Sequence, residues 1–471
     1  MKKQTKAATA AQENTDLIDL ASLKGKRWQV SFDEPELTSD AGIAAVLASG
    51  VGEDLIDALA DAIHDRRRTP VHSVREILSQ RLHLMMAGFH HGDDSDRLRH
   101  DSVFQSASGR EVGAALASQP TVSRLENSVG RADILRLSLA LLEWSLGHCQ
   151  KSKKTLPMLV IDLDPSAHVV YGQQELGFFN GYVGDTCLMP FYILDGVTGR
   201  PLGAVMREGT TPNSGEILAV LRRIVEVVRR MLPETRILLR ADGHLTKPAV
   251  MDWMEEQTGT GAGAVSRRGV EHVTGLPGNK VLERLFAPAV KAAADKRAHL
   301  VEQGEDASLE ITTYTEATYA ARSWSRERRV VARLIAGPLG VDVRYVVTSL
   351  NAGSAQYIYQ TIYCGRGEAE RCIRECKSLG SDTSPCTSAT ANAFRLIQHM
   401  AVYGILHRFR EVVLQGTRWS RSMLGTIQLQ LLKRAARVVV TARKVRLHLS
   451  ARVDDEVRGA WRRAAYARTP G

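Results

Sequence analysis

The stretch TLPMLVIDLDPS, residues 155–166, decides the fold, because the sequence changes there from helical to strand-like character. Its apolar run reads as a buried strand that ends in two acids, Asp162 and Asp164. The segments that follow alternate between strand and helix patterns: strands over 186–196, 201–209 and 235–244, and helices over 214–232 and 248–259. This order predicts an α/β fold built on a mixed sheet flanked by helices.

The region before this strand, residues 30–153, is predicted to be helical, since its apolar residues recur every three or four positions. Within it, residues 112–127 suggest a helix, a short turn and a second helix, with Arg124 facing solvent. Such a pair either forms a helix-turn-helix, whose second helix enters a DNA major groove, or packs as part of a bundle. The sequence favours neither reading over the other.

The part of the chain after residue 270 mixes helix and strand patterns. A charged helix is expected over 277–303, followed by three strand-like segments over 309–319, 328–335 and 343–350. A core helix is expected over 391–415. The tail, 433–468, holds eleven lysines and arginines against three acids, so it is either a solvated basic segment or one that contacts a nucleic-acid backbone.

The composition of the 471 residues is that of a globular protein, and its net charge of +10 favours a polyanionic partner, nucleic acid ahead of a membrane surface. No apolar run approaches the roughly 18 residues of a spanning helix. The N-terminus lacks the apolar core of a signal peptide. Six cysteines, four of them between 364 and 386, show no Cys-x-x-Cys pair, so free thiols are favoured over zinc and a cytoplasmic location is expected.

The stretch YCGRGEAERCIRECKSLGSD, residues 363–382, places four polar side chains on one helix face: Tyr363, Arg366, Glu370 and Lys377. At about 100° per residue, their spacing of three, four and seven positions aligns them closely. Glycines on both sides of Arg366 cost about 1 kcal/mol each in a helix interior, so the regular helix is expected to begin only near Arg366. The stripe is either a solvated face or the lining of a charged site.

Carboxylates also end two of the predicted strands. Asp162 and Asp164 point to the same face of their strand, and Asp242 ends the strand over 235–244. Any one of them alone is explained by capping of the following turn, but the conjunction with Glu370 is not. Carboxylates without His or Cys partners favour Mg²⁺ or Mn²⁺, and a pair of such ions can cleave a phosphodiester.

These features resemble the DDE transposases of bacterial insertion sequences, which have an RNase H-like core. Tyr363, Arg366, Glu370 and Lys377 match the signature Tyr-x2-Arg-x3-Glu-x6-Lys of one branch without a gap. Three stretches resemble blocks of the insertion-sequence 1380 group: IDLDPSAHVVYGQQELGFFNGYVG, YILDGVTGRPLGAVMREG and RILLRADGHLTKPAVMDWMEE. The stretch LASQPTVSRLEN resembles the N-terminal block of the same group. The likeness extends over roughly residues 30–450.

The resemblance implies a role for each acid. Asp242 is the second catalytic acid and Glu370 is the third. The first is expected to be Asp164, because Asp164-Pro165-Ser166 matches the Asp-x-Ser/Thr pattern, with Asp162 as the alternative. The three acids would hold two Mg²⁺ ions, for which Mn²⁺ can substitute.

Several basic and aromatic residues are implied to bind DNA. Tyr363, Arg366 and Lys377 are expected to contact the backbone of the transposon end beside the cleavage site. Trp324, in the segment between the second and third acids, either stacks on an unpaired base or is a buried structural residue. Arg124 is expected to contact DNA from the helical region.

The patterns and the resemblance together divide the chain into six parts: a disordered lead-in (1–29), a helical DNA-binding region (30–153), the first part of the core (154–270), a β-rich insertion (271–350), the completion of the core with the Glu-bearing helix (351–416), and a basic C-terminal region (417–471). The expected function is binding of terminal inverted repeats in double-stranded DNA, cleavage at the ends and joining to target DNA by a homodimer in the prokaryotic cytoplasm. The alternatives are a metal-dependent nuclease of the same fold and a domesticated DNA-binding regulator.

Overall fold

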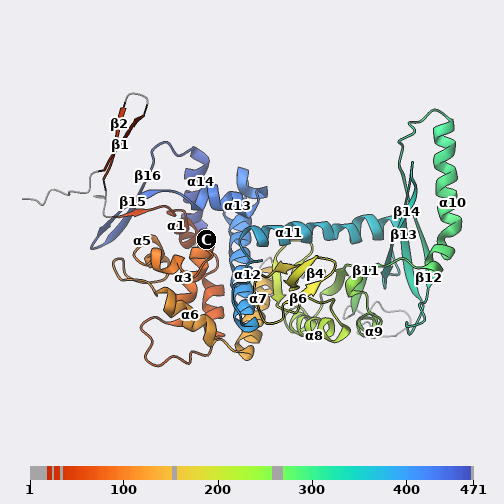
Figure 1. Ribbon diagram of the computed structural model, residues 1–471, viewed down its shortest axis with the longest axis horizontal. Helices are drawn as coiled ribbons and strands as arrows, with labels where there is room; N and C mark the ends of the chain where they lie inside the picture. The colour runs from red at the N-terminus through yellow and green to blue at the C-terminus, as the bar shows by residue number, and fades with distance from the viewer. Residues whose placement is uncertain (1–17, 24–25, 32–35, 151–155, 257–268, 468–471) are drawn as a thin grey trace, which may run out of the picture.

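The computed structural model describes residues 18–23, 26–31, 36–150, 156–256 and 269–467 (Figure 1). Its central element is a sheet of eight strands in the order β12-β13-β14-β11-β10-β4-β8-β9. In chain order these strands are β4 (Met158–Pro165), β8 (Phe191–Asp195), β9 (Pro201–Val205), β10 (Arg236–Ala241), β11 (Val270–Leu276), β12 (Ile311–Tyr319), β13 (Arg328–Gly337) and β14 (Gly340–Thr348).

The sheet is mixed, as predicted. Strands β4, β8 and β9 form an antiparallel meander, whereas β10 and then β11 run parallel to β4. The parallel strands are joined through helices, as parallel connections require. A small sheet of β5 (His168–Val169), β7 (Asp185–Leu188) and β6 (Phe178–Asn180) lies in the connection between β4 and β8. The arrangement is consistent with an RNase H-like core.

Helices cover both faces of the sheet. One face packs on α7 (Arg131–Gln150), α8 (Ser214–Met231), α9 (Pro248–Glu256) and α10 (Lys280–Glu302). The other face packs on the π-helical segment η2 (Tyr357–Tyr363), α11 (Gly367–Ser378) and α12 (Ala389–Val412). Alternate residues of β4 point to opposite faces, so Leu159, Ile161 and Leu163 reach one layer, while Val160, Asp162 and Asp164 face the layer of η2 and α11.

The predicted insertion extends the core sheet and does not stand apart from it. β14 pairs antiparallel with β11, and β13 and β12 follow outward. The predicted boundary at residue 271 falls inside β11, a strand of the core whose residues 270–274 pair parallel with β10. Sequence alone could not place this boundary, since the apolar alternation of a core strand and of an insertion strand look alike.

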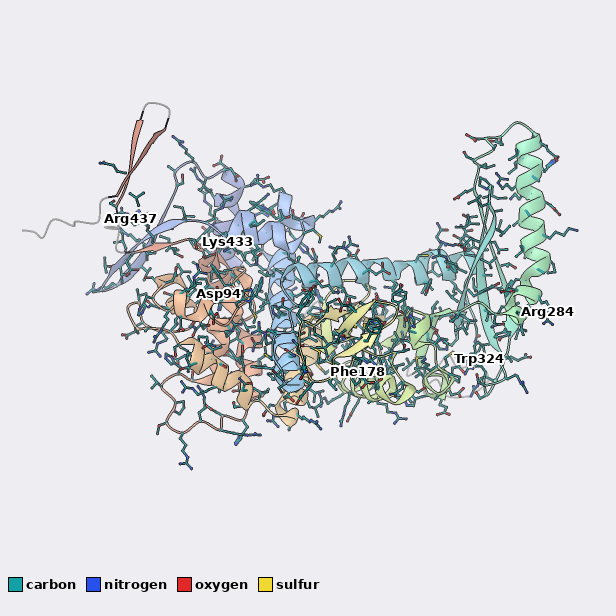
Figure 2. All side chains as sticks on the ribbon, in the orientation of Figure 1. Asp94, Phe178, Arg284, Trp324, Lys433 and Arg437 are labelled. Carbon is teal, nitrogen blue, oxygen red and sulfur yellow. The ribbon has the colours of Figure 1, made fainter. Side chains whose placement is uncertain are left out.

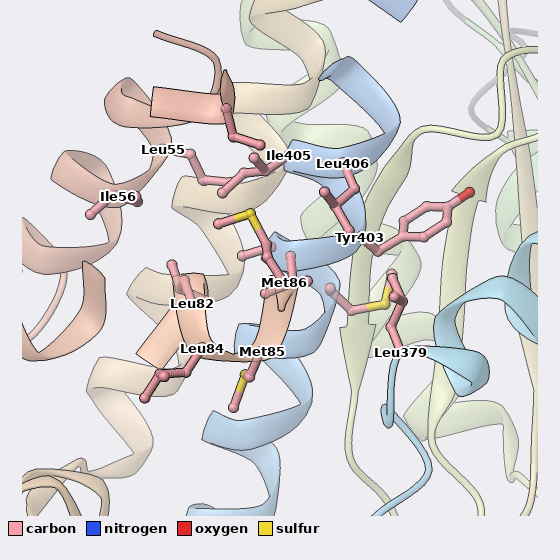
Figure 3. Packing of buried hydrophobic residues seen from close by; sticks show 14 of the residues in the cluster. Leu55, Ile56, Leu82, Leu84, Met85, Met86, Leu379, Tyr403, Ile405 and Leu406 are labelled. Atoms are coloured by element: carbon pink, nitrogen blue, oxygen red, sulfur yellow. The ribbon is translucent and has the colours of Figure 1, made fainter. Parts of the chain in front are cut away.

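The N-terminal region packs on α12 (Figure 3). Its helices are α1 (Ile43–Ser49), α2 (Glu53–Asp61), α3 (Val74–Met86), α4 (Asp94–Arg97), α5 (Ser102–Ala107) and α6 (Gln119–Ser128). Leu55, Leu82 and Met86 meet Ile405 and Leu406 of α12 in one buried cluster. The prediction of an all-helical region was incomplete, because β3 (Leu37–Thr38) pairs with a C-terminal strand.

Two further segments differ from the sequence-based expectation. Part of the predicted disordered lead-in forms an antiparallel hairpin of β1 (Ile18–Leu23) and β2 (Lys26–Val30). The first helix of the predicted helix-turn-helix, at 112–118, is absent, although the second is α6. The chain is held there as a loop because the side chain of Gln80 binds both the N–H and the carbonyl of Ala117.

The C-terminal region packs against the N-terminal region. Strands β15 (Ala436–Thr441) and β16 (Lys444–Leu449) form a hairpin whose inner strand pairs with β3, and α14 (Asp455–Ala467) contributes buried residues to the same core as α1. Across the described ranges, no helix has the length and apolarity needed to cross a membrane.

Candidate functional site

Two acids lie at the carboxyl ends of neighbouring parallel strands. β10 and β4 pair in register through Arg240 with Asp162 and Ala241 with Leu163, so the next residues, Asp242 and Asp164, end the two strands side by side. Asp242 also accepts a hydrogen bond from the N–H of His244 at 2.9 Å. Its second carboxylate oxygen is left for another partner.

Asp162 is engaged in a buried ion pair. Its two carboxylate oxygens each accept a hydrogen bond of 2.7 Å from the guanidinium of Arg240, and the side chains are 1% and 7% exposed. Arg240 donates further bonds of 3.0 Å to the carbonyls of Gly196 and Ile362. A Cβ on Gly365 would lie only 2.4 Å from this guanidinium, so glycine is needed there. Asp162 therefore anchors the turn that leads into α11.

Asp164 lies on the same strand face but has a different environment. Arg366 donates hydrogen bonds of 3.1 Å to Asp164 and 3.1 Å to Glu370, so one guanidinium bridges two acids. Burial raises the pKa of Asp164 to about 7 despite Arg366. The nearby negative charges of Asp242 and Glu370 add to this rise. Three acids thus converge on one arginine.

The donor set suits a hard divalent cation. Asp164, Asp242 and Glu370 supply carboxylate oxygens only, which are the ligands of Mg²⁺ and Mn²⁺. Among the residues that the structure describes, no three acidic, histidine or cysteine side chains are already placed to hold an ion. Arg366 supplies the positive charge between Asp164 and Glu370. Burial first, and the neighbouring acids second, raise the pKa of Asp164; a bound divalent cation would favour its ionised form, which is the form that ligates a metal.

The signature stripe is only partly a regular helix. Tyr363 ends the π-helical segment, residues 364–366 form a 3₁₀ turn, and α11 begins at Gly367, close to the expected start. The ring of Tyr363 lies 5.4 Å from that of Tyr359 and 6.0 Å from the guanidinium carbon of Arg366. Tyr363 and Arg366 thus remain neighbours although the segment is not a regular α-helix.

Lys377 is separated from this group. Its amine donates a hydrogen bond of 2.9 Å to the carbonyl of Ala167, in the loop that follows β4. Burial lowers the pKa of Lys377. Three of the four signature residues, Tyr363, Arg366 and Glu370, line one pocket, and Lys377 does not.

The pocket has a volume of about 480 Å³ and a basic, aromatic wall. The strands β13 and β14 contribute Arg333 and Arg344, which are cross-strand partners. Tyr345 and Tyr359 complete this wall, and the guanidinium carbon of Arg333 lies 5.3 Å from the ring of Tyr359. Sequence reasoning missed these four residues. The pairing of β13 with β14 brings Arg333, Arg344 and Tyr345 to the pocket, η2 brings Tyr359, and of the three acids Glu370 is the one in the lining.

Two predicted DNA-binding residues lie outside the pocket lining. Trp324 is half-buried, with its ring 5.2 Å from Tyr319 and 5.2 Å from the guanidinium carbon of Arg328 (Figure 2). Arg124 is exposed on α6 and donates a hydrogen bond of 3.3 Å to the hydroxyl of Thr121. Their roles in DNA binding stay predictions.

The cysteines in the described ranges are free thiols. Cys372 and Cys376 are buried on the face of α11 opposite the acids, and burial raises the pKa of both thiols. Cys364 is exposed at the edge of the pocket. Cys149 lies where its side chain is outside the described part of the structure.

A family model described as Transposase DDE domain group 1 matches residues 20–458. A comparison with curated proteins gives no match. Among solved structures, the chain is similar to piggyBac transposase in a synaptic complex with hairpin DNA, with 11% sequence identity and a TM-score of 0.43 over 84% of this chain and 80% of that chain. The stretch matched by the family model contains all three acids and the whole pocket.

Proposed function

Because the chain belongs to the family of DDE transposase domains of group 1, we propose that it binds the terminal inverted repeats of an insertion sequence, cleaves at the ends and joins the freed 3′-OH to target DNA. We place it in the bacterial insertion-sequence 1380 group on its Tyr-Arg-Glu-Lys signature. The observation that carries the proposal is the convergence of Asp164, Asp242 and Glu370 around Arg366, beside a basic pocket.

Asp164, Asp242 and Glu370 are the residues that would hold Mg²⁺. The chemistry that Mg²⁺ would supply there is activation of a water or 3′-hydroxyl and stabilisation of the leaving oxygen in an in-line displacement. The protein holds two of the three acids in place for metal binding, because Asp164 and Asp242 lie at the ends of hydrogen-bonded strands. Asp162 is assigned to the structural pair with Arg240 and not to the metal site.

Arg366 has two roles in the proposal. In the DNA-free protein its guanidinium compensates the charge of Asp164 and Glu370, which would otherwise repel each other. When DNA is bound, the same N–H donors suit a phosphate oxygen beside the cleaved bond. The paired arginines Arg333 and Arg344 would hold the next phosphates along the pocket wall, and Tyr363 would pack against the sugar or base.

The DNA beyond the cleavage site would run toward the N-terminal region, where α6 carries the exposed Arg124. Two ends have to be held together for joining, so a homodimer on DNA is expected. Trp324 and Lys377 remain candidate contacts outside the pocket.

The test is incubation of the full chain with a labelled duplex that ends in the inverted repeat, with Mg²⁺ present. Wild type should cut and join, while Asp242→Ala and Glu370→Ala should do neither. The matched control is Glu226→Ala, which removes an exposed acid from α8. Cleavage without joining would favour a nuclease. Binding without cleavage by the wild type would favour a regulator. Full activity of both site variants would refute the assignment of the acids.

A further inference from the structure

The C-terminal hairpin of β15 and β16 is a two-faced ribbon. Its register runs from Ala436 with Leu449 to Thr441 with Lys444, so the side chains of paired residues share a face. One face is apolar and carries Ala436, Val438, Val440, Val445, Leu447 and Leu449. The other carries Arg437, Val439, Thr441, Lys444, Arg446 and His448. The ribbon therefore has one apolar face and one basic face.

The tip of the ribbon projects beyond the body of the protein. At its base, Ala436 and Val438 are 4% exposed and pack on the core. Toward the turn, Val440 and Val445 of the same face are 44% and 48% exposed. Figure 1 shows β15 and β16 extending outward on the side of α12 opposite α11. The outer part of the hairpin is thus open to a partner on both faces.

The outer face of the ribbon is basic. Arg437, Lys444, Arg446 and His448 are all exposed, and Arg443 lies in the turn. Residues 433–452 hold seven lysines and arginines and no acid. Within the described ranges, Arg437, Lys444 and Arg446 take part in no ion pair. At the base of the same hairpin, by contrast, Lys433 binds Asp40 at 3.2 Å.

We propose that the β15–β16 ribbon docks its basic face into the major groove of double-stranded DNA. The major groove of B-DNA, about 12 Å wide, admits a two-stranded ribbon, and its walls are phosphates that Lys and Arg contact. A folded, exposed element with alternate cationic side chains has the charge complementary to a duplex. A solvated basic tail would require no such separation of faces.

This inference rests on the proposed function, which identifies the bound DNA as the duplex at the element's own end. The ribbon shares a sheet with β3 of the N-terminal region, so it belongs to the part of the molecule assigned to end recognition. It lies away from the pocket, across α12 (Figure 1). Its contacts would therefore fall on duplex away from the cleaved phosphates.

The test compares the full chain with the triple variant Arg437→Gln, Lys444→Gln, Arg446→Gln on a labelled duplex of roughly 30 base pairs, about three helical turns. Binding should weaken roughly tenfold, and the slope of log K against log salt should fall by about 3. The control variant is Arg222→Gln, Arg223→Gln, Arg230→Gln on α8, which also loses three exposed charges. Thermal unfolding checks that all proteins are folded.

A second readout locates the groove. Methylation of guanine N7, which lies in the major groove, should be suppressed by wild type and restored with the triple ribbon variant. Unchanged affinity and salt slope, or N7 protection that persists in the ribbon variant, would overturn the inference. An equal loss in the α8 variant would show a non-specific charge effect and would also overturn it.

The ribbon inference and the catalytic proposal can be refuted independently of each other. If Asp242→Ala binds but does not cut, and the triple ribbon variant binds the duplex more weakly than wild type, both stand. If wild type binds through the ribbon but never cuts, the catalytic proposal fails alone. If cleavage depends on the acids while the ribbon variant binds normally, the ribbon inference fails alone.

Discussion

At the scale of single residues, two aspartates on one strand face have different partners. Asp162 is ion-paired with Arg240. The guanidinium of Arg240 also donates hydrogen bonds to the turn at Gly196 and to the segment before α11. Asp164 meets Arg366 and the other two acids. The sequence placed both side chains on the same face, and the position of Arg240 distinguishes the acid of the buried ion pair from the acid that we propose as a metal ligand.

Substitution of Asp162 should lower the stability of the protein, whereas substitution of Asp164 should lower its cleavage rate. Asp162→Asn should lower the free energy of unfolding by about 3–5 kcal/mol, because it leaves the buried Arg240 without its counter-charge. Asp164→Asn should leave stability nearly unchanged and lower the cleavage rate at least ~10²-fold. Urea unfolding and the end-cleavage assay measure both variants. If Asp162→Asn is stable but fails to cut DNA, then Asp162 would be the metal ligand and Asp164 the structural acid.

The glycine at 275 should be required for the position of Tyr363. A Cβ there would lie 2.8 Å from the Tyr363 hydroxyl and 2.9 Å from the N–H nitrogen of Gly243, closer than van der Waals contact. Gly275→Ala should therefore shift the tyrosine and lower cleavage by roughly 10²-fold. The control is Gly278→Ala in the same pocket, whose Cβ would meet Tyr345 at an ordinary 3.5 Å. Equal activity of the two variants would refute the requirement.

At the scale of elements, the site is assembled from strand ends and one helix start. The segment 357–366 reaches α11 through π and 3₁₀ turns, so Arg366 lies at the helix N-terminus beside both strands. The strands of the predicted insertion extend the sheet past β11 and deliver Arg333 and Arg344 to the same pocket. The pocket thus joins core and insertion.

A buried network ties the insertion to the core on the opposite face. Glu255 of α9 accepts hydrogen bonds from Arg328 of β13 at 2.7 Å and lies 3.0 Å from the ring nitrogen of His272 of β11. Burial alone would raise the pKa of Glu255, but the hydrogen bonds from His272 and Arg328 outweigh it and lower the pKa to about 2. The carboxylate therefore stabilises the folded state while it is charged.

This network predicts a pH-dependent loss in Glu255→Gln. Because the folded-state pKa is depressed, the stabilisation is complete above about pH 4.5 and is lost as pH falls through about 2. The variant should lose about 2–3 kcal/mol of unfolding free energy at pH 7 and progressively less below pH 4. Denaturant titrations across pH measure this, with the exposed neighbour Glu256→Gln as control. A pH-independent deficit would contradict the electrostatic explanation.

Much of the fold was predictable from local pattern. The alternation of strands and helices from β4 to α9 and the acids at the ends of β4 and β10 follow from apolar periodicity. What the sequence could not show depends on contacts distant along the chain. The loop at 112–118 is fixed by Gln80, and Arg333 reaches the site only through its register with Arg344.

At the scale of the whole molecule, two groups of basic side chains lie apart. Arg333, Arg344 and Arg366 line the pocket, while Arg437 and Arg446 lie on the β15–β16 ribbon, which Figure 1 shows on the other side of α12 from α11. A DNA duplex that contacts both would lie along the long axis of the molecule.

The activity proposed for this protein requires that Asp164, Asp242 and Glu370 hold a catalytic divalent ion. The most direct test is the rate of end cleavage by Asp242→Cys in Mn²⁺ and in Mg²⁺, each relative to wild type. A thiolate is a poor ligand for Mg²⁺ and a better one for Mn²⁺, so the ratio of the Mn²⁺ rate to the Mg²⁺ rate should rise well above the wild-type ratio. A ratio equal to that of wild type would contradict the assignment.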